Sequence, residues 1–241
     1  MRYGIFADIH SNLEALDAVL AALSGENIDE YLCIGDIVGY GADPLSCIYK
    51  VRLVTQNIVA GNHEFACADL FALSNLNEVA AQGVIWTKKV LSTKELEFFK
   101  NLLLVFENKD LVMVHGSLDD PQDFYYLYQP HDSRETFKLL KKNICFIGHT
   151  HRPKIFVKRD IIVSLLSGYK TEINPEYKYI VNIGSVGQPR DGDMRAAYCI
   201  YDTNKQDVEI KRVSYDIEKA QRKIIEAGLP RFLAERLAVG R

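Results

Sequence analysis

The chain has 241 residues, of which 48% are hydrophobic and 25% are charged. This length suits one large domain, and the composition is that of a globular protein with enough apolar side chains for a sizeable core. The net charge of -3 provides no general positive field, so we expect no nucleic-acid binding.

The first half of the chain alternates short apolar runs with helical patterns. Residues 12–23 place apolar side chains at the spacing of one helix face, and Asp43-Pro44 is typical of a helix start. The other predicted elements are strands at residues 3–7, 31–34 and 57–60 and a mostly helical stretch at residues 64–100. This alternation predicts βαβ units and a sheet that is at least partly parallel.

Strand patterns dominate the second half, where Asn108-Lys109-Asp110 is a hairpin signal and residues 133–142 predict a helix. The strand-like runs are residues 103–107, 111–115, 144–147, 154–158, 161–166, 179–183, 196–202 and 207–213. They predict a second, more antiparallel sheet. The expected fold class is therefore mixed α/β, a four-layer αββα sandwich in which two mixed sheets face each other and helices lie outside.

The strand patterns end near residue 213. We therefore expect one domain over residues 1–213 and a C-terminal helical tail over residues 214–241. The tail has two amphipathic patterns, one on each side of Gly228-Leu229-Pro230. The pattern leaves open whether these helices cover the domain or form a homodimer contact.

The sequence contains no sign of export or membrane insertion. Asp8 and His10 interrupt the first apolar run too early for a signal-peptide core, and no apolar stretch reaches the length of about 18 residues that predicts a membrane span. The five cysteines are widely spaced and include no Cys-x-x-Cys pair. We expect reduced cysteines and a cytoplasmic location.

Hard polar side chains follow several of the predicted strands, and five of the six histidines occur in this setting. The set is Asp8, His10, Asp36, Asn62, His63, His115, His149 and His151. Because open α/β sheets bind ligands at the carboxyl ends of their strands, we expect these side chains to converge in space. A single strand-end histidine is more often a cap or a surface group, but that explanation does not fit the whole set.

Imidazole, carboxylate and amide donors suit divalent cations such as manganese, iron, zinc, cobalt or nickel. A bridging carboxylate can hold two such ions about 3.5–4 Å apart, the separation typical of two-metal hydrolases. The thiol spacing of a structural zinc site is missing. The residue types therefore predict a centre of divalent metal ions.

The motifs resemble those of the calcineurin-like metallophosphoesterase superfamily over roughly residues 1–213. In chain order they are Asp8-Ile9-His10, Gly35-Asp36, Gly61-Asn62-His63-Glu64, His115-Gly116 and Gly148-His149-Thr150-His151. Residues 182–190 are similar to a segment of its small bacterial and archaeal phosphodiesterases, although Ile183 stands where those usually have proline.

The resemblance implies two divalent metal ions, with manganese favoured, and a water or hydroxide between them that attacks the phosphate ester. The implied ligands are Asp8, His10 and His151 for the first ion, Asn62, His115 and His149 for the second, and Asp36 for both. His63 is then implied to contact the leaving-group oxygen, either as general acid or as charge stabiliser.

The implied substrate is a small phosphodiester or nucleotide-type ester, such as a cyclic nucleotide or a dinucleoside polyphosphate. Two arginines that protein Ser/Thr phosphatases of the superfamily have near the bridging aspartate and after the GNHE motif are missing here. Without that bidentate clamp a phosphoprotein substrate is less expected. Arg190 is the remaining candidate for a phosphate contact. Tyr40 and the aromatic residues of segment 117–130 are candidates either for a nucleotide contact or for packing.

Two other functions stay open from the sequence. Some members of the superfamily keep the fold as catalytically silent scaffold or binding proteins, but these tend to lose ligands that this chain retains. A DNA nuclease is the other alternative, and the mild acidity of the chain argues against it.

Overall fold

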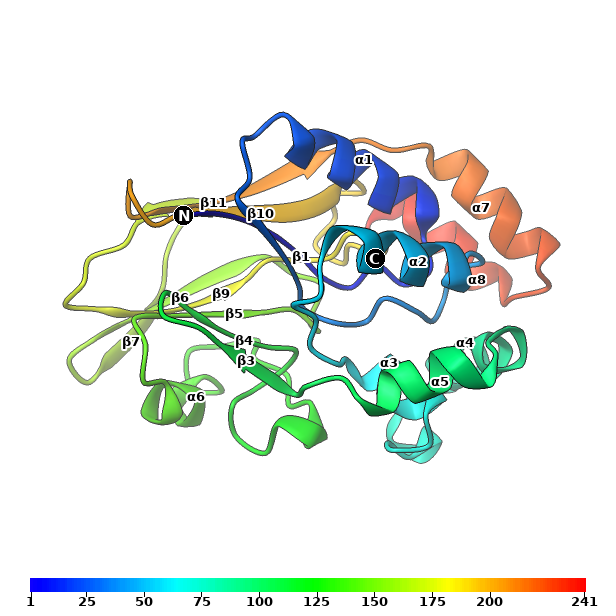
Figure 1. Cartoon of the computed structure of the whole chain (residues 1–241), viewed down its shortest axis with the longest axis horizontal. Coiled ribbons are helices and arrows are strands. Elements are labelled where there is room, and N and C mark those ends of the chain that lie inside the picture. The colour runs from blue at the N-terminus through cyan, green and yellow to red at the C-terminus, as the bar shows by residue number, and fades with distance from the viewer.

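Two mixed β-sheets lie face to face in the computed structural model, which describes residues 1–241. Figure 1 shows the two sheets stacked, with α1 (Leu13–Ser24) on the outer side of one and α6 (Arg134–Leu139) on the outer side of the other. Apolar side chains from both sheets, among them Ile5, Phe146 and Val181, form the core between them. The predicted layered fold of two mixed sheets flanked by helices is confirmed.

The first sheet has the strand order β2-β1-β10-β11-β8. Its strands are β1 (Arg2–Phe6), β2 (Glu30–Cys33), β8 (Lys170–Glu172), β10 (Ala196–Asp202) and β11 (Asp207–Val213). β1 pairs parallel with β2 and antiparallel with β10. The assignment of the whole second half to a separate sheet is therefore wrong. Side-chain alternation indicates which face of a strand is buried, but not which distant strand it pairs with.

The second sheet has the order β3-β4-β5-β9-β6-β7. Its strands are β3 (Val105–Glu107), β4 (Val112–Val114), β5 (Ile144–Ile147), β6 (Lys154–Arg159), β7 (Ile162–Leu165) and β9 (Lys178–Asn182). β3 and β4 form the predicted hairpin. β4, β5 and β9 run parallel, so their carboxyl ends meet at one edge of the sheet.

Residues 57–60 do not form the predicted full strand. Ile58 and Val59 make only isolated bridges, to Cys33 and Leu103 respectively. The segment crosses from β2 of the first sheet to the chain just before β3 of the second, so neither side can extend into a ladder. It nevertheless carries the chain to Gly61 at the start of α3 (Asn62–Cys67).

The remaining helices flank the first sheet or lie beside its carboxyl edge (Figure 1). They are α2 (Pro44–Val54), α4 (Glu78–Val90), α5 (Thr93–Lys100), α7 (Ile217–Glu226) and α8 (Arg231–Glu235), with short 3₁₀ turns at Leu73–Asn75, Pro121–Asp123 and Arg236–Val239. Leu16, Val19 and Leu23 are the buried face of α1 and pack with Phe6 of β1. No helix in the fold combines the length and the apolar character needed to cross the membrane.

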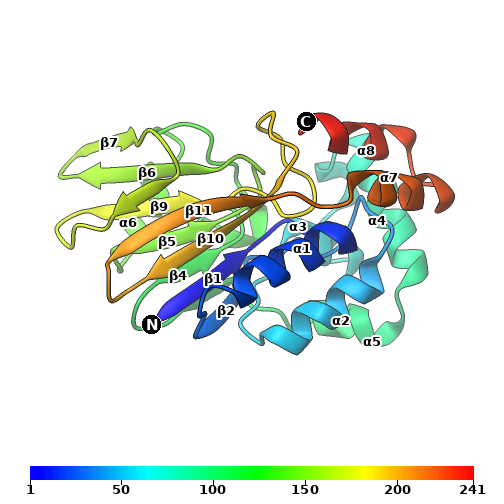
Figure 2. The ribbon, with the colours of Figure 1, turned by 90° about the horizontal axis from the view of Figure 1, so that it is seen from above.

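The C-terminal helices pack against α4 and the loop after β2. Leu233 and Leu237 are buried in a small apolar cluster with Tyr40, and the indole Nε1–H of Trp86 donates to the carbonyl of Ala227 at 3.0 Å. Figure 2 shows α7 and α8 next to α4 and beside the loop that precedes β10. The end of the chain therefore lies close to the edge where the polar residues gather.

Candidate metal centre

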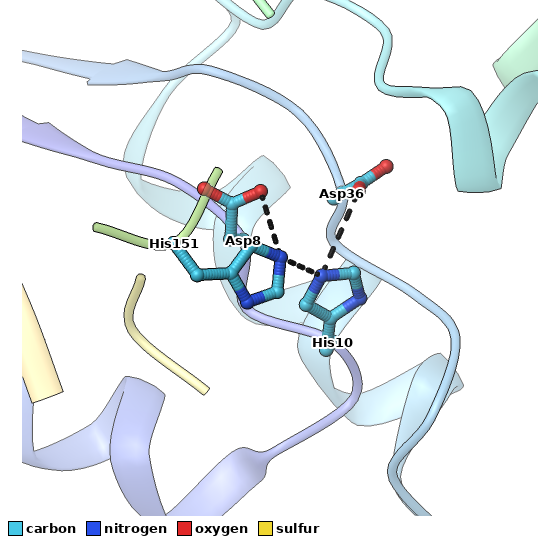
Figure 3. Close-up of side chains that lie close together, drawn as sticks. All are labelled: Asp8, His10, Asp36 and His151. Carbon is cyan, nitrogen blue, oxygen red and sulfur yellow. Dashed lines mark hydrogen bonds and ion pairs between the residues drawn. The ribbon is translucent and has the colours of Figure 1, made fainter. Parts of the chain in front are cut away.

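Asp8, His10, Asp36 and His151 come together at the carboxyl ends of β1, β2 and β5, and all four are buried. Figure 3 shows their side chains pointing toward a common point. The Nε2 atoms of His10 and His151 are 3.0 Å apart. His151 Nε2 is 3.5 Å from an Asp8 oxygen, and His10 Nε2 is 3.6 Å from an Asp36 oxygen.

A second buried cluster consists of Asp36, His115 and His149. His115 Nε2 lies 3.2 Å from Asp36 Oδ2 and 3.8 Å from Asp8 Oδ1. The donor atoms within each cluster lie within 4.8 Å of one another. Asp36 belongs to both clusters and therefore joins them into one centre. With Asn62 added, this centre contains all seven residues that the sequence suggested as metal ligands.

Backbone carbonyls orient three of the histidines. The Nδ1 atoms of His10, His115 and His151 face the carbonyl oxygens of Val38, Ile34 and Gln188 at 3.0, 2.7 and 2.6 Å. A carbonyl can only accept, so Nδ1 carries a hydrogen in each ring, and in the neutral rings of His10 and His151 Nε2 offers a lone pair. Two such lone pairs, on His10 and His151, then face each other at 3.0 Å, an arrangement that a cation between them would stabilise.

Asn62 and His63 start α3 beside these clusters. Asn62 Oδ1 and His149 Nε2 are buried and have no hydrogen-bond partner within the protein. Buried polar atoms normally have a partner, so these orphaned acceptors fit a metal ion as their missing contact. The backbone N–H of His63 donates to Asp36 Oδ1 at 2.9 Å, and the rings of His63 and His10 are 4.7 Å apart.

Tyr40 and Arg190 lie at the side of the first cluster. The ring of Tyr40 is 4.6 Å from the rings of both His10 and His63, and the guanidinium carbon of Arg190 lies 5.6 Å from the Tyr40 ring centre. Every site residue proposed from the sequence is therefore found in one region. The Arg190 side chain contacts Gln188 and the ring of Tyr40, and the Arg190 backbone N–H donates to the carbonyl of His151 at 3.2 Å.

Several residues of the centre have strained backbone conformations. The set with positive φ is Asp8, His10, Asp36, Tyr40, His149 and His151, with φ between 49° and 66°. Such left-handed conformations are uncommon for residues other than glycine and cluster at functional sites. Here they turn the chain sharply after each strand, so that the side chains point into the centre.

Sequence reasoning gave no role to Glu64, which holds two of the ligand loops together. Its buried carboxylate accepts the backbone N–H groups of Asp36, Val38 and Gly61 at 2.8, 3.1 and 2.9 Å. The available signal was its place at the third position of α3, where a glutamate commonly caps the helix start.

Ser185 and Asn182 were also missed. The Ser185 hydroxyl donates to the carbonyl of Asp8 at 2.8 Å. The Asn182 amide donates to the carbonyl of Gly148 at 2.6 Å. Both belong to segment 182–190, which therefore supports the loops of the first cluster from the end of β9.

Residues 1–206 match the calcineurin-like phosphoesterase superfamily domain. The chain belongs to this superfamily. It is 39% identical over 241 residues to an uncharacterised protein of Methanocaldococcus jannaschii, an alignment that covers 98% of this chain and 97% of the relative.

Two solved structures extend this result to the whole fold. A metallophosphoesterase from Sphaerobacter thermophilus superposes with a TM-score of 0.86 and 36% identity, covering 100% of this chain and 99% of the other. A protein from Pyrococcus horikoshii superposes with a TM-score of 0.80 and 20% identity, covering 100% and 98%. The second likeness concerns the fold alone.

The protonation states of the histidines and carboxylates in the centre favour the binding of cations. Burial lowers the pKa of His10, His149 and His151 well below the usual range, so these rings are neutral, as metal ligation requires. Burial also lowers the pKa of His63, to about 4. Burial opposes ionisation of Asp36, but the facing histidines, His115 first, outweigh it and hold the Asp36 pKa well below its usual range.

The pKa values of His115 and Asp8 are raised, in contrast to those of the other histidines and of Asp36. Burial would lower the pKa of His115, but the carboxylates of Asp36 and Asp8 outweigh it and raise this pKa to about 10. Burial, with the Asp36 charge, raises the pKa of Asp8 against the attraction of His115. Two buried carboxylates this close require compensating positive charge, which His115 or bound cations can provide.

An aromatic cavity of about 380 Å³ adjoins the second cluster. Asn62 and His149 are on its wall, together with Phe71, Phe124 and Tyr126. The Tyr126 ring stacks on His149, with ring centres 3.9 Å apart and an interplanar angle of 19°. Phe124, Tyr125 and Tyr126 of the predicted aromatic segment thus line the cavity, whereas Tyr128 does not.

Proposed function

We propose that this protein is a metal-dependent phosphoesterase that hydrolyses phosphodiester or nucleotide-type phosphate esters with two divalent ions. The observation that carries the proposal is the pair of buried donor clusters that share Asp36. Asp8, His10, Asp36 and His151 would hold one ion, and Asp36, Asn62, His115 and His149 the other. The imidazole, carboxylate and amide donors suit divalent cations such as manganese, iron, zinc, cobalt or nickel, and the resemblance to the superfamily favours manganese among them.

Bound ions of this kind would acidify a water molecule into a nucleophile and neutralise the charge of the phosphoryl oxygens. The protein's own residues would complete the reaction. His63 would stabilise or protonate the leaving oxygen, since negative charge developing beside its ring favours the protonated imidazole. Its backbone N–H already donates to Asp36, which fixes the ring next to the shared ligand.

Substrate preference would follow from the flanks of the centre. The aromatic cavity beside Asn62 and His149 supports a flat ring in the substrate, such as a nucleobase stacked on Tyr126. Arg190 and Tyr40 lie beside the first cluster and would contact the phosphate. Both features favour a nucleotide-type ester.

The test is hydrolysis of bis-p-nitrophenyl phosphate by protein stripped with EDTA and then reloaded. We expect Mn²⁺ to restore activity and about two ions per chain to be retained, as two-metal sites require. Asp36→Asn should lower both metal content and activity. Inactivity with manganese, iron, zinc, cobalt and nickel alike would contradict the proposal and favour a scaffold function.

A further inference from the structure

A cleft of about 700 Å³ with a strongly basic lining adjoins the metal centre. Its cationic side chains are Arg152, Lys154, Arg190, Arg236 and Arg241. The only acidic residue on its wall is Asp191, whose carboxylate is already paired with the guanidinium of Arg212. The cleft is therefore a local concentration of positive charge in a chain with a net charge of -3.

None of these five cations is paired with an Asp or Glu side chain. Arg190 Nη2 donates to the amide oxygen of Gln188 at 2.7 Å, and Arg152 Nε donates to the carbonyl of Arg190 at 2.9 Å. Lys154 Nζ donates to the carbonyl of Tyr128 at 2.6 Å, and Arg236 Nε donates to the main-chain oxygen of Arg241. The acceptors of Arg190, Arg152 and Lys154 are neutral, so they hold these three side chains in place without cancelling their charge.

The C-terminal segment brings Arg236 to this cleft. Leu237 is buried in the apolar cluster around Tyr40, and the backbone N–H of Gly192 donates to the carbonyl of Gly240 at 2.9 Å. The segment thus lies against the loop after β9, as Figure 2 shows. Burial, with the nearby charge of Arg190, lowers the pKa of Arg236 to about 10. The fold holds these two like charges close together, and an anion between them would relieve their repulsion.

Arg190 connects the cleft with the metal centre. Its guanidinium lies over the ring of Tyr40, which contacts His10 and His63, and Arg152 directly follows His151 in the chain. An ester bound at the metal ligands could therefore extend a second anionic group into the cleft.

We propose that the basic cleft binds a second phosphate group of the substrate, so that the preferred substrate carries at least two phosphates. This inference rests on the proposed function, because the scissile ester is assigned to the metal centre. Arg236 and Arg190 would contact the second phosphate directly. That phosphate is either joined to the scissile one in a chain or attached elsewhere on the molecule.

Binding measurements test this directly, with three ligands that differ in phosphate number and position. Thymidine 5′-monophosphate, thymidine 5′-diphosphate and thymidine 3′,5′-bisphosphate are titrated by calorimetry into the full chain loaded with Mn²⁺, and phosphate release is measured in parallel to correct for hydrolysis. We expect one of the two-phosphate ligands to bind at least about tenfold more tightly than the monophosphate, the gain of one charge-assisted contact. Preference for the diphosphate indicates a joined phosphate chain, and preference for the bisphosphate a separate group.

Arg236→Gln should remove this tenfold gain. Arg231→Gln is the matched control, because Arg231 lies in the same C-terminal segment, is largely exposed and pairs with Glu235; it should retain the gain. Thermal unfolding of both variants checks that the segment stays packed. Equal affinity for all three ligands, or a full gain in folded Arg236→Gln, would overturn the inference.

The same preparations, loaded with Mn²⁺, are assayed with three p-nitrophenyl esters. These are the ester of thymidine 5′-phosphate, the same ester with an added 3′-phosphate, and the p-nitrophenyl ester of thymidine 5′-triphosphate. A higher kcat/KM for a multiply phosphorylated ester supports the inference. Hydrolysis of the one-phosphate ester without any binding gain would overturn only the cleft assignment. A binding gain without hydrolysis of any ester would leave the anion site supported and overturn the proposed phosphoesterase function.

Discussion

His63 lies against the ring of His10 and next to Tyr40, with its backbone bonded to the shared ligand Asp36. Its Nδ1 is buried and has no hydrogen-bond partner in the protein. It is not a member of either donor cluster. A histidine so placed can act on a bound substrate without taking part in metal binding, and this separates its role from that of its neighbours.

His63→Asn should therefore lower kcat by roughly 100-fold or more, the usual contribution of a positioned general acid, while metal content stays unchanged. His131→Asn is the matched control, since the His131 side chain is 70% exposed and belongs to neither donor cluster. Steady-state kinetics with metal analysis measures both effects. Near-normal turnover in His63→Asn would remove His63 from the mechanism.

Gly39 determines where the His63 ring can lie. Gly39 has φ +90°, and a Cβ added there would be 2.0 Å from His63 Nδ1. Gly39→Ala should displace the ring and lower kcat in the same direction as His63→Asn. Gly168→Ala tests strain alone, because Gly168 has φ +86° and nothing within 4 Å of the added Cβ. Each variant should lose about 1 kcal/mol of stability, but only Gly39→Ala should lose activity.

If Gly168→Ala lost as much activity as Gly39→Ala, the effect would have to be assigned to general destabilisation. If Gly39→Ala kept full kcat, the position of the ring would be unimportant for turnover. A crystal structure of Gly39→Ala would show whether the imidazole has moved.

The short helix α3 acts mainly through its first turn. Glu64 at its third position accepts N–H groups from the loop after β2 and from Gly61, so one carboxylate ties together the chain segments that carry Asp36 and Asn62. The helix itself is too short to be stable by propensity alone. Burial of all its residues and these three bonds hold it in place.

Glu64→Ala should lower the free energy of unfolding by roughly 3 kcal/mol, because buried N–H groups lose their only side-chain acceptor. Manganese affinity should fall by about 10- to 100-fold, as when a group that orients metal ligands is removed. Glu95→Ala is the matched control: Glu95 makes the same kind of capping contact with Ser92 at the exposed start of α5. It should cost no more than about 1 kcal/mol.

Urea unfolding of metal-free protein and equilibrium dialysis with Mn²⁺ measure the two effects. Equal stability losses in Glu64→Ala and Glu95→Ala would show that the buried capping contact has no special weight. A large stability loss with unchanged manganese affinity would show that Glu64 supports the fold but does not orient the ligands.

On the scale of the whole molecule, the C-terminal segment is joined to the N-terminal layer by an ion-pair network. Lys223 of α7 lies 2.7 Å from Glu14 of α1 and 2.8 Å from Asp43 before α2. The Glu14 side chain is only 5% exposed. Burial opposes ionisation of Glu14, but contact with Lys223 outweighs it and lowers the pKa of this carboxyl.

Lys223→Met should lower the free energy of unfolding by roughly 1–2 kcal/mol near pH 7, since it leaves a buried carboxylate with only the more exposed Lys219. A carboxyl group whose pKa is lowered in the folded state stabilises the fold at pH values above the ordinary glutamate pKa of 4.5. This stabilisation is lost as the pH falls through the folded-state pKa. The difference between wild type and variant should therefore shrink in acid. Lys100→Met, which breaks an exposed pair with Glu97, should change stability by less than about 0.5 kcal/mol.

Chemical unfolding across a series of pH values measures this difference. A constant gap between wild type and Lys223→Met down to acidic pH would mean that Glu14 is not the titrating partner. A gap as small as that of Lys100→Met at neutral pH would mean that the network contributes little to holding the segment that carries Arg236.

The local sequence is enough to recognise the polar residue types and their place after apolar runs, and these predict the chemistry of the centre. Asp8, Asp36, His115 and His149 could be chosen without a structure because a strand and the residue after it are local features with a readable period. The same holds for the β3–β4 hairpin, whose turn is encoded within a few residues. Resemblance to a known superfamily then supplied the expected division of roles.

Features that depend on distant neighbours become visible only in the folded chain. β10 pairs with β1 and brings β11 into the same sheet, and residues 57–60 are reduced to isolated bridges. Glu64 accepts a hydrogen bond from Asp36, 28 residues away. The basic cleft likewise combines Arg152 and Arg190 with Arg236 from the end of the chain. Side-chain periodicity indicates which face of an element is buried, whereas pairing and charge convergence arise from contacts between segments that no local pattern specifies.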